Sequence, residues 1–159
     1  MRNMSFAMTT EQVRNQDKTV TRRFGWWYLQ PGDVVQPVVK GMGLRKGEKV
    51  EKIGPPIRIV STRTEALRDM TDEDCVREGF PEMDRMAFIN MLCLHYCTVG
   101  PCTYVNRIEF EYLDNADFRA LQDLRESCTP NAHVEGFERS ENTLRRDVGG
   151  TDQEGARER

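Results

Sequence analysis

The clearest hydrophobic pattern in the chain is an alternation over residues 103–113, TYVNRIEFEYL. Apolar and aromatic side chains share one set of alternate positions, and charged side chains share the other: Tyr104, Ile108, Phe110 and Tyr112 on one face, Arg107, Glu109 and Glu111 on the other. A period of two residues is typical of a β-strand. The segment is therefore predicted to be a strand whose two faces differ in polarity.

Shorter apolar runs predict four further strands: MSFAM at 4–8, VVQPVVK at 34–40, EKVEKI at 48–53 and PIRIVSTRT at 56–64. Pro37 lies inside the second of these runs, and because proline has no N–H to donate, it predicts an edge strand or a bulged strand. The intervening GMGLRKGEK has three glycines and four charged residues. It is predicted to be a loop or a hairpin tip.

Two segments show helical signals on either side of the central part of the chain. Residues 9–16 are predicted to form a short helix, because Thr9 and Gln12 have the spacing of a capping box. Residues 81–96 are predicted to form a longer helix that begins at Pro81. Its apolar stripe at every fourth position predicts packing on the core: Phe88, Leu92 and Tyr96.

A third helix is predicted over residues 71–78. Thr71 is a good N-cap, three acidic residues follow in the first turn where the helix dipole favours them, and Gly79 comes directly after the end. Glu78 is then the last helical residue. This is an unfavourable place for a carboxylate, since the carbonyl end of a helix repels negative charge.

Strands and helices together predict a small α+β domain with a curled, barrel-like sheet and flanking helices. We place this domain at residues 1–114. Residues 115–127 have one apolar stripe, which predicts a short helix. Residues 128–159 contain few large apolar side chains, so we expect them to form a disordered tail.

Composition excludes several classes of protein. No run of 18 apolar residues occurs, and the first fifteen residues lack the apolar core of a signal peptide, so we expect a cytoplasmic protein without membrane association. Five cysteines in such a chain are expected to be free thiols rather than a disulfide framework.

The net charge of −3 conceals an asymmetry along the chain. Residues 1–63 carry 12 Lys and Arg against 5 Asp and Glu, whereas residues 64–113 carry 4 against 10 and residues 114–159 carry 7 against 11. The basic first part is compatible with a face for polyanions. It is equally compatible with two parts that attract each other in the folded state.

Basic, hydroxyl and aromatic residues concentrate in KTVTRR, residues 18–23, and the WWY that follows. Arg22 and Arg23 have the forked donors that bind phosphate, and Trp26 and Trp27 are able to stack on a base. A tryptophan in such a cluster is equally able to belong to the core. These residues predict a binding site for RNA or a modified nucleoside.

The same segment also predicts a catalytic site. A threonine hydroxyl is a poor nucleophile unless a base takes its proton, and the amine of Lys18 is such a base when it is neutral. Arg22 and Arg23 are close enough in sequence to lower the pKa of Lys18. In a regular strand Lys18 and Thr21 point to opposite faces, so they converge only if a turn or bulge lies between them.

The order of KTVTRR, PGDVV, the acidic helix ending REGF and the final VNRIEFEYL resembles the ASCH domain of the PUA-like superfamily, in particular its phage-encoded members, over about residues 4–113. The resemblance implies a PUA-like fold with a cleft for RNA, nucleotides or modified nucleosides. One branch, the small bacterial N(4)-acetylcytidine amidohydrolases, uses a lysine, a threonine and a glutamate. These match Lys18, Thr21 and Glu78, and Arg23 falls where that branch also has an arginine.

If the site is an amidase, Thr21 attacks the acyl carbonyl, Lys18 accepts its proton, and Glu78 orients Lys18 or protonates the leaving amine. Backbone N–H groups or Arg23 then stabilise the oxyanion. This chain departs from the amidohydrolases in its TRR motif, its longer loop GMGLRKGEKVEKIGPP and its additional tail. The departures leave the substrate open, and a non-catalytic RNA-binding, nucleotide-binding or protein-interaction module is the alternative.

A metal site is the remaining alternative, since four potential ligands lie close together in the sequence: Cys93, His95, Cys97 and Cys102. Their spacing differs from the CxxC pairs of tetrahedral zinc sites, so we expect buried thiols and neither a metal nor another cofactor. The oligomeric state is left open by the sequence.

Overall fold

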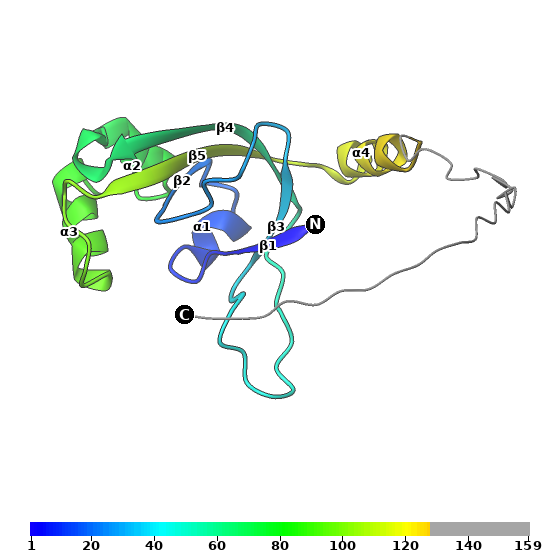
Figure 1. The fold of residues 1–159 in the computed structure, drawn as a ribbon, viewed down its shortest axis with the longest axis horizontal. Helices are drawn as coiled ribbons and strands as arrows, with labels where there is room; N and C mark the ends of the chain where they lie inside the picture. Colours follow the sequence, from blue (N-terminus) through cyan, green and yellow to red (C-terminus); the bar gives the residue numbers. More distant parts are fainter. Residues whose placement is uncertain (128–159) are drawn as a thin grey trace, which may run out of the picture. The chain divides into compact units, whose positions relative to one another are not determined.

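A five-stranded sheet organises residues 1–127, which are the residues that the computed structural model describes (Figure 1). The strands are β1 (Arg2–Ser5), β2 (Val20–Arg23), β3 (Val34–Val38), β4 (Ile57–Ala66) and β5 (Tyr104–Tyr112). Their order in the sheet is β1-β3-β4-β5-β2, with β1 parallel to β3 and the other neighbours antiparallel. The domain is therefore α+β, as predicted, but the sheet is open, with β1 and β2 at its edges, so the predicted small curled barrel is wrong.

The position of Pro37 explains how proline fits in a central strand. β3 lies between β1 and β4 instead of at an edge, and Pro37 is paired with Met4 of β1. Pairing with β4 involves only the first two residues of β3, Val34 and Val35. The missing N–H of Pro37 therefore falls beyond the paired part of β4, and no ladder hydrogen bond is lost there.

Helices connect and flank these strands: α1 (Thr10–Arg14), α2 (Asp72–Arg77), α3 (Arg85–His95) and α4 (Asn115–Ser127), with a 3-10 turn at Leu67–Asp69. Figure 1 shows α4 beyond the end of β5, at the end of the domain opposite to α2 and α3. The hydroxyl of Thr71 accepts a hydrogen bond from the Asp74 N–H at 3.2 Å, which confirms the predicted N-cap of α2.

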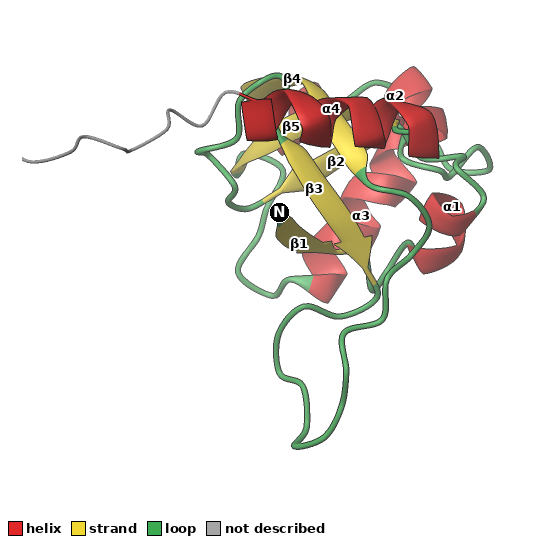
Figure 2. Ribbon diagram, turned by 90° about the vertical axis from the view of Figure 1, so that its right-hand side faces the viewer, coloured by secondary structure: helices red, strands yellow, loops and turns green. Residues whose placement is uncertain are grey.

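Other predicted boundaries are wrong by a few residues. α3 begins at Arg85, with Asp84 as its N-cap, because the side chain of Asp84 accepts from the Ala87 N–H at 2.7 Å. Pro81 instead lies in the turn before it. Residues 48–53 contribute one isolated bridge, between Lys52 and Val38, and otherwise belong to the long loop between β3 and β4 that extends from the domain in Figure 2.

Two apolar clusters stabilise the domain by burying side chains from different elements. The first cluster lies between β1, α1, β3, β4 and β5 and includes Phe6, Ile59 and Phe110. The second is formed by the 3-10 turn, α2, α3 and the start of β5, and includes Leu67 and Phe88. The cavity described below is lined by residues of both clusters: Phe6 of the first, and Phe88 and Leu92 of the second.

The expected disordered tail, residues 128–159, lies outside the described residues, and the domain boundary at 114 stays a prediction. None of the helices within residues 1–127 has the length and apolar character needed to cross a membrane.

Candidate functional site

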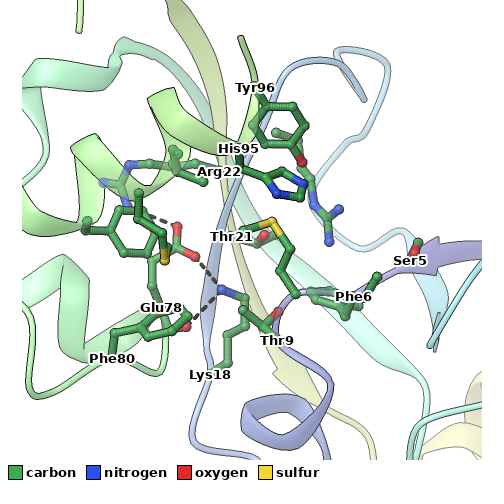
Figure 3. A pocket seen from close by; sticks show the side chains of 16 residues that line it. Ser5, Phe6, Thr9, Lys18, Thr21, Arg22, Glu78, Phe80, His95 and Tyr96 are labelled. Atoms are coloured by element: carbon green, nitrogen blue, oxygen red, sulfur yellow. Dashed lines mark hydrogen bonds and ion pairs between the residues drawn. The ribbon is translucent and has the colours of Figure 1, made fainter. Parts of the chain in front are cut away.

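A cavity of about 150 Å³ opens where the two apolar clusters meet. Its walls come from the segment after β1, from β2 and the residues before it, from the end of α2, and from α3 (Figure 3). It is lined by Ser5, Phe6, Ala7, Met8, Thr9, Lys18, Thr21, Arg22, Arg23, Glu78, Phe80, Phe88, Met91, Leu92, His95 and Tyr96. The cavity thus brings together five of the seven residues that the sequence predicted for the site.

Lys18 reaches the cavity from outside the strand. β2 begins only at Val20, so the alternation of side chains along a strand does not extend back to Lys18. The backbone of Lys18 is fixed on both sides, because its N–H donates to the Gln12 carbonyl at 3.3 Å and its carbonyl accepts from the Tyr112 hydroxyl at 2.7 Å. This turn between α1 and β2 is what lets Lys18 and Thr21 line the same cavity.

Glu78 is the C-cap of α2, one residue beyond the last helical residue, Arg77. Gly79 follows with φ +87°, a conformation that glycine adopts without strain. A Cβ at Gly79 would lie 2.6 Å from Cγ of Gln12 and 2.7 Å from its Cβ. Gly79 therefore allows α1 to pack against the end of α2, and this contact keeps the Lys18 segment beside Glu78.

Lys18 and Glu78 form a buried pair, with the two side chains 2% and 3% exposed. The Lys18 amine donates to the backbone carbonyl of Glu78 at 2.9 Å and also to its Oε2. Burial lowers the pKa of Lys18; Glu78 opposes this effect, and the charges of Arg23 and Arg22 add to it. The amine therefore loses its proton more readily than an ordinary lysine does.

Arg22 holds the carboxylate of Glu78 from the other side. Its Nη1 donates to Glu78 Oε1 at 3.2 Å, its Nε donates to Glu65 Oε1 at 2.9 Å, and its Nη2 pairs with both Glu65 and Asp74. Burial disfavours the charge of Arg22, but these three carboxylates outweigh it and raise the pKa. The cations beside Glu78 explain why a carboxylate is stable at the carbonyl end of a helix.

The charged layer continues behind Arg22, between β5 and α2. Asp74 accepts from Arg107 Nη2 at 2.8 Å, and Arg107 is buried, although it lies on the charged face of the predicted strand. Burial alone would raise the pKa of Asp74. The hydrogen bonds to Arg107 and the charge of Arg22 outweigh burial and lower this pKa to about 2. Asp74 of α2 packs on this face of the sheet and pairs with Arg22 and Arg107. The charged face predicted from the alternation is therefore buried as a layer of ion pairs.

Two threonine hydroxyls face the cavity. Thr21 is 4% exposed and Thr9 is 9% exposed, and within residues 1–124 neither side chain has a hydrogen-bond partner. Figure 3 shows the Lys18 amine bonded to Glu78 on one side, with Thr21 and Thr9 on its other side. Both hydroxyls are therefore available as hydrogen-bond donors and acceptors at the cavity wall.

Arg23 differs from its neighbour in having no carboxylate partner among residues 1–124. Its Nε is buried without a hydrogen bond in the described part of the chain, and its guanidinium lies 4.6 Å from the centroid of the Phe6 ring. Burial lowers the pKa of Arg23, an effect that the charge of Glu78 only partly offsets. Arg23 therefore contributes an uncompensated positive charge to the cavity wall.

The two tryptophans do not line the cavity. Trp26 has φ +63° and packs against the first apolar cluster, and its carbonyl accepts from the Asn106 amide at 3.0 Å. Trp27 is 52% exposed. Base stacking by either residue in this cavity would require a movement of the chain, so their predicted ligand-binding role remains an untested prediction.

The cysteines give no metal site in the described residues, where no group of three or more potential His, Cys, Asp or Glu ligands is gathered. Cys75 is buried, Cys93 is part-buried, Cys97 and Cys102 are exposed, and all four are free thiols. His95 instead lies at the cavity, in edge-to-face contact with Tyr96 at 4.7 Å between ring centroids.

Sequence reasoning missed several cavity residues, namely Phe6, Thr9, His95 and Tyr96. The i, i+4, i+8 stripe of α3 did indicate which face packs inward, but it predicted core packing for Tyr96, which is 40% exposed. Ser5 to Thr9 had no signal of their own, since their place in the cavity depends on the parallel pairing of β1 with β3.

No family model matches the chain, and no curated protein matches it. Among solved structures, the chain is similar to a protein from Enterococcus faecalis V583 described by the family model DUF984. The identity is 14%, the match covers 71% of this chain and 80% of that chain, and the TM-score is 0.44. A similarity of this degree carries no argument about function.

Proposed function

We propose that the protein hydrolyses the N-acyl amide of a modified nucleoside of the N(4)-acetylcytidine kind, with Lys18, Thr21 and Glu78 as its catalytic residues. The observation that carries the proposal is that these three side chains line one cavity, with the Lys18 amine hydrogen-bonded to Glu78. The resemblance of KTVTRR and the other motifs to ASCH domains of the PUA-like superfamily supports it, because one branch of that family uses these residue types.

The base is the neutral amine of Lys18. A neutral amine has two N–H bonds and one lone pair, and the two hydrogen bonds to Glu78 use both N–H bonds. The lone pair is then left for a proton from another direction. Because burial lowers the pKa of Lys18, the neutral form is populated at a lower pH than in an exposed lysine.

The reaction has two halves. In the first, Thr21 Oγ1 attacks the acyl carbon while Lys18 takes the hydroxyl proton; the C–N bond then breaks, and Lys18 gives this proton to the leaving amine. In the second, water attacks the acyl-threonine, Lys18 takes a proton from the water and returns it to Thr21. The products are a carboxylic acid and the free amino nucleoside, so one amide and one water are consumed.

The size and walls of the cavity favour a single-ring base. Cavities of about 150 Å³ in other proteins admit one six-membered aromatic ring. Phe80, Phe88 and Leu92 supply apolar walls, and Lys18, Thr21 and Glu78 supply the polar groups at one end. A pyrimidine therefore suits this space better than a two-ring purine does.

The test is a panel of acylated nucleosides incubated with the protein and with Thr21→Ala. We expect release of cytidine from N(4)-acetylcytidine by the parent protein, no turnover by Thr21→Ala, and nearly unchanged affinity. Thr64→Ala, an exposed threonine on β4, is the matched control and keeps full turnover. Binding of the panel without any turnover by the parent protein would exclude the hydrolase and leave a non-catalytic nucleoside-binding or RNA-binding module.

A further inference from the structure

Arg23 is the exception in an otherwise paired set of buried and part-buried cations. Four basic side chains around the cavity and in the charged layer have a carboxylate partner: Lys18, Arg22, Arg77 and Arg107. Arg23 has none within the described residues, and its Nε is buried without a hydrogen bond. Arg23 is part-buried, and a buried N–H donor without an acceptor costs stability, yet the fold holds this donor at the cavity wall.

The place of Arg23 in the strand aims it at the same space as Thr21. The two residues are separated by one position in β2, so their side chains leave the same face of the strand. Both line the cavity. Arg22, between them, is turned to Glu65, Asp74 and Glu78 and is already satisfied.

Packing on Phe6 explains part of this arrangement but leaves the guanidinium unsatisfied. A cation over an aromatic ring gains about 0.5–2 kcal/mol. That contact leaves the buried Nε–H of Arg23 without an acceptor in the described part of the chain. A guanidinium binds a carboxylate or a phosphate through two parallel N–H bonds, so an oxyanion is the ligand group that suits Arg23 best.

We propose that Arg23 binds an oxyanion carried by the ligand of this cavity, either a phosphate or a carboxylate. This inference rests on the proposed function only in taking the cavity as the ligand site, and it narrows the ligand class from neutral nucleosides to anionic ones. The anion has two possible sources: a 5′-phosphate on the ribose, or a carboxylate at the end of the acyl group.

The experiment measures affinity by calorimetry for two matched pairs of ligands. Cytidine and cytidine 5′-monophosphate test the phosphate, and N(4)-acetylcytidine and N(4)-succinylcytidine, measured in the Thr21→Ala variant, test the carboxylate. Each pair is measured with Arg23 present and with Arg23→Gln, and Arg58→Gln is the control because Arg58 pairs with Glu111 on an exposed part of the sheet.

We expect the anionic member of at least one pair to bind about tenfold or more tightly than its neutral partner, since one charge-assisted bond contributes that much. Arg23→Gln should remove this difference, Arg23→Lys should retain part of it, and Arg58→Gln should retain all of it. The pair that shows the difference identifies the source of the anion. The cytidine pair does not react, so this result does not depend on hydrolysis.

Two outcomes would overturn the inference. One is equal affinity for the charged and neutral members of both pairs. The other is a preference for the charged members that persists in Arg23→Gln, since another cation would then bind the anion. If Arg23 served only the oxyanion of the reaction, Arg23→Gln would slow turnover without changing these affinities, which is also a refutation.

Discussion

The cavity has two sides that use adjacent arginines in opposite ways. On the paired side, Arg22 contacts Glu65, Asp74 and Glu78, so its charge is compensated inside the protein. On the ligand side, Arg23 lies beside Phe6 with no carboxylate partner in the described chain. The first arrangement holds the site together, whereas the second is the position from which we propose that Arg23 binds an anion. Two identical neighbours in one strand thus have different roles because of what faces them.

The largest effect is expected on the paired side. Arg22→Gln leaves Glu65, Asp74 and Glu78 without their shared cation, and breaking a buried ion pair in this way costs about 3–5 kcal/mol of unfolding free energy. Chemical denaturation of the parent protein and of Arg22→Gln measures this loss. A loss no greater than that of the exposed control, Arg58→Gln, would show that the network does not stabilise the fold.

Gly79→Ala tests the contact that keeps Glu78 beside Lys18. The left-handed conformation costs an alanine about 1–2 kcal/mol, and the overlap with Gln12 adds about 1–3 kcal/mol. We expect lower unfolding free energy and, because α1 moves away from α2, lower turnover. Gly32→Ala is the matched control: Gly32 has φ +90° but no neighbouring atom within 4 Å of the added Cβ, so it pays only the conformational cost. Equal losses in both variants would contradict a special role for the Gln12 contact.

A smaller, pH-dependent effect is expected from Asp74. Folding lowers the pKa of Asp74 from 3.8 to about 2. Its ion pairs therefore stabilise the native state at pH values above 3.8, and this stabilisation is lost as the pH falls from 3.8 towards about 2. The unfolding free energy of the parent protein should therefore decrease more steeply over this interval than that of Asp74→Asn. Denaturant titrations of the two proteins at several pH values measure the difference. Parallel pH curves would indicate that Asp74 is not stabilised by Arg22 and Arg107.

The smallest effect is expected on the ligand side, and it has the opposite sign. Arg23→Gln removes a charge that has no partner, so the ligand-free protein should melt at the same temperature or a few degrees higher, the shift expected for about 1 kcal/mol. Thermal unfolding of the parent protein, Arg22→Gln and Arg23→Gln in one buffer measures both changes: a lower melting temperature is expected for Arg22→Gln, and an equal or higher one for Arg23→Gln. A clear decrease in melting temperature for Arg23→Gln would mean that Arg23 has a structural role.

Local signals predicted much of the fold. The alternation in residues 103–113 identified β5, and Thr71 and its acidic neighbours identified α2, because capping and periodicity act over a few residues. The predicted barrel was wrong because closure would require pairing between β1 and β2, which are consecutive strands along the chain but lie at opposite edges of the sheet. No local pattern in either strand specifies its neighbour.

The site was predicted less completely than the fold. The motif KTVTRR predicted Lys18 and Thr21 as site residues, and the resemblance to the ASCH domain added Glu78. The sequence left open which influence decides the pKa of Lys18, and in the structure burial outweighs the carboxylate. The difference between Arg22 and Arg23 could not be predicted either, since it depends on Glu65 and Asp74, which reach Arg22 from β4 and α2.

The most direct test of the central claim is to locate the acyl group during turnover. The protein, in excess over N(4)-acetylcytidine, is quenched in acid at short times, and its peptides are mapped by mass spectrometry. The proposed mechanism predicts an acetyl group on Thr21 in the parent protein and none in Thr21→Ala, which also releases no cytidine. An acetyl group on Thr9 instead, or cytidine release by Thr21→Ala at the parent rate, would contradict the assignment of Thr21 as the nucleophile.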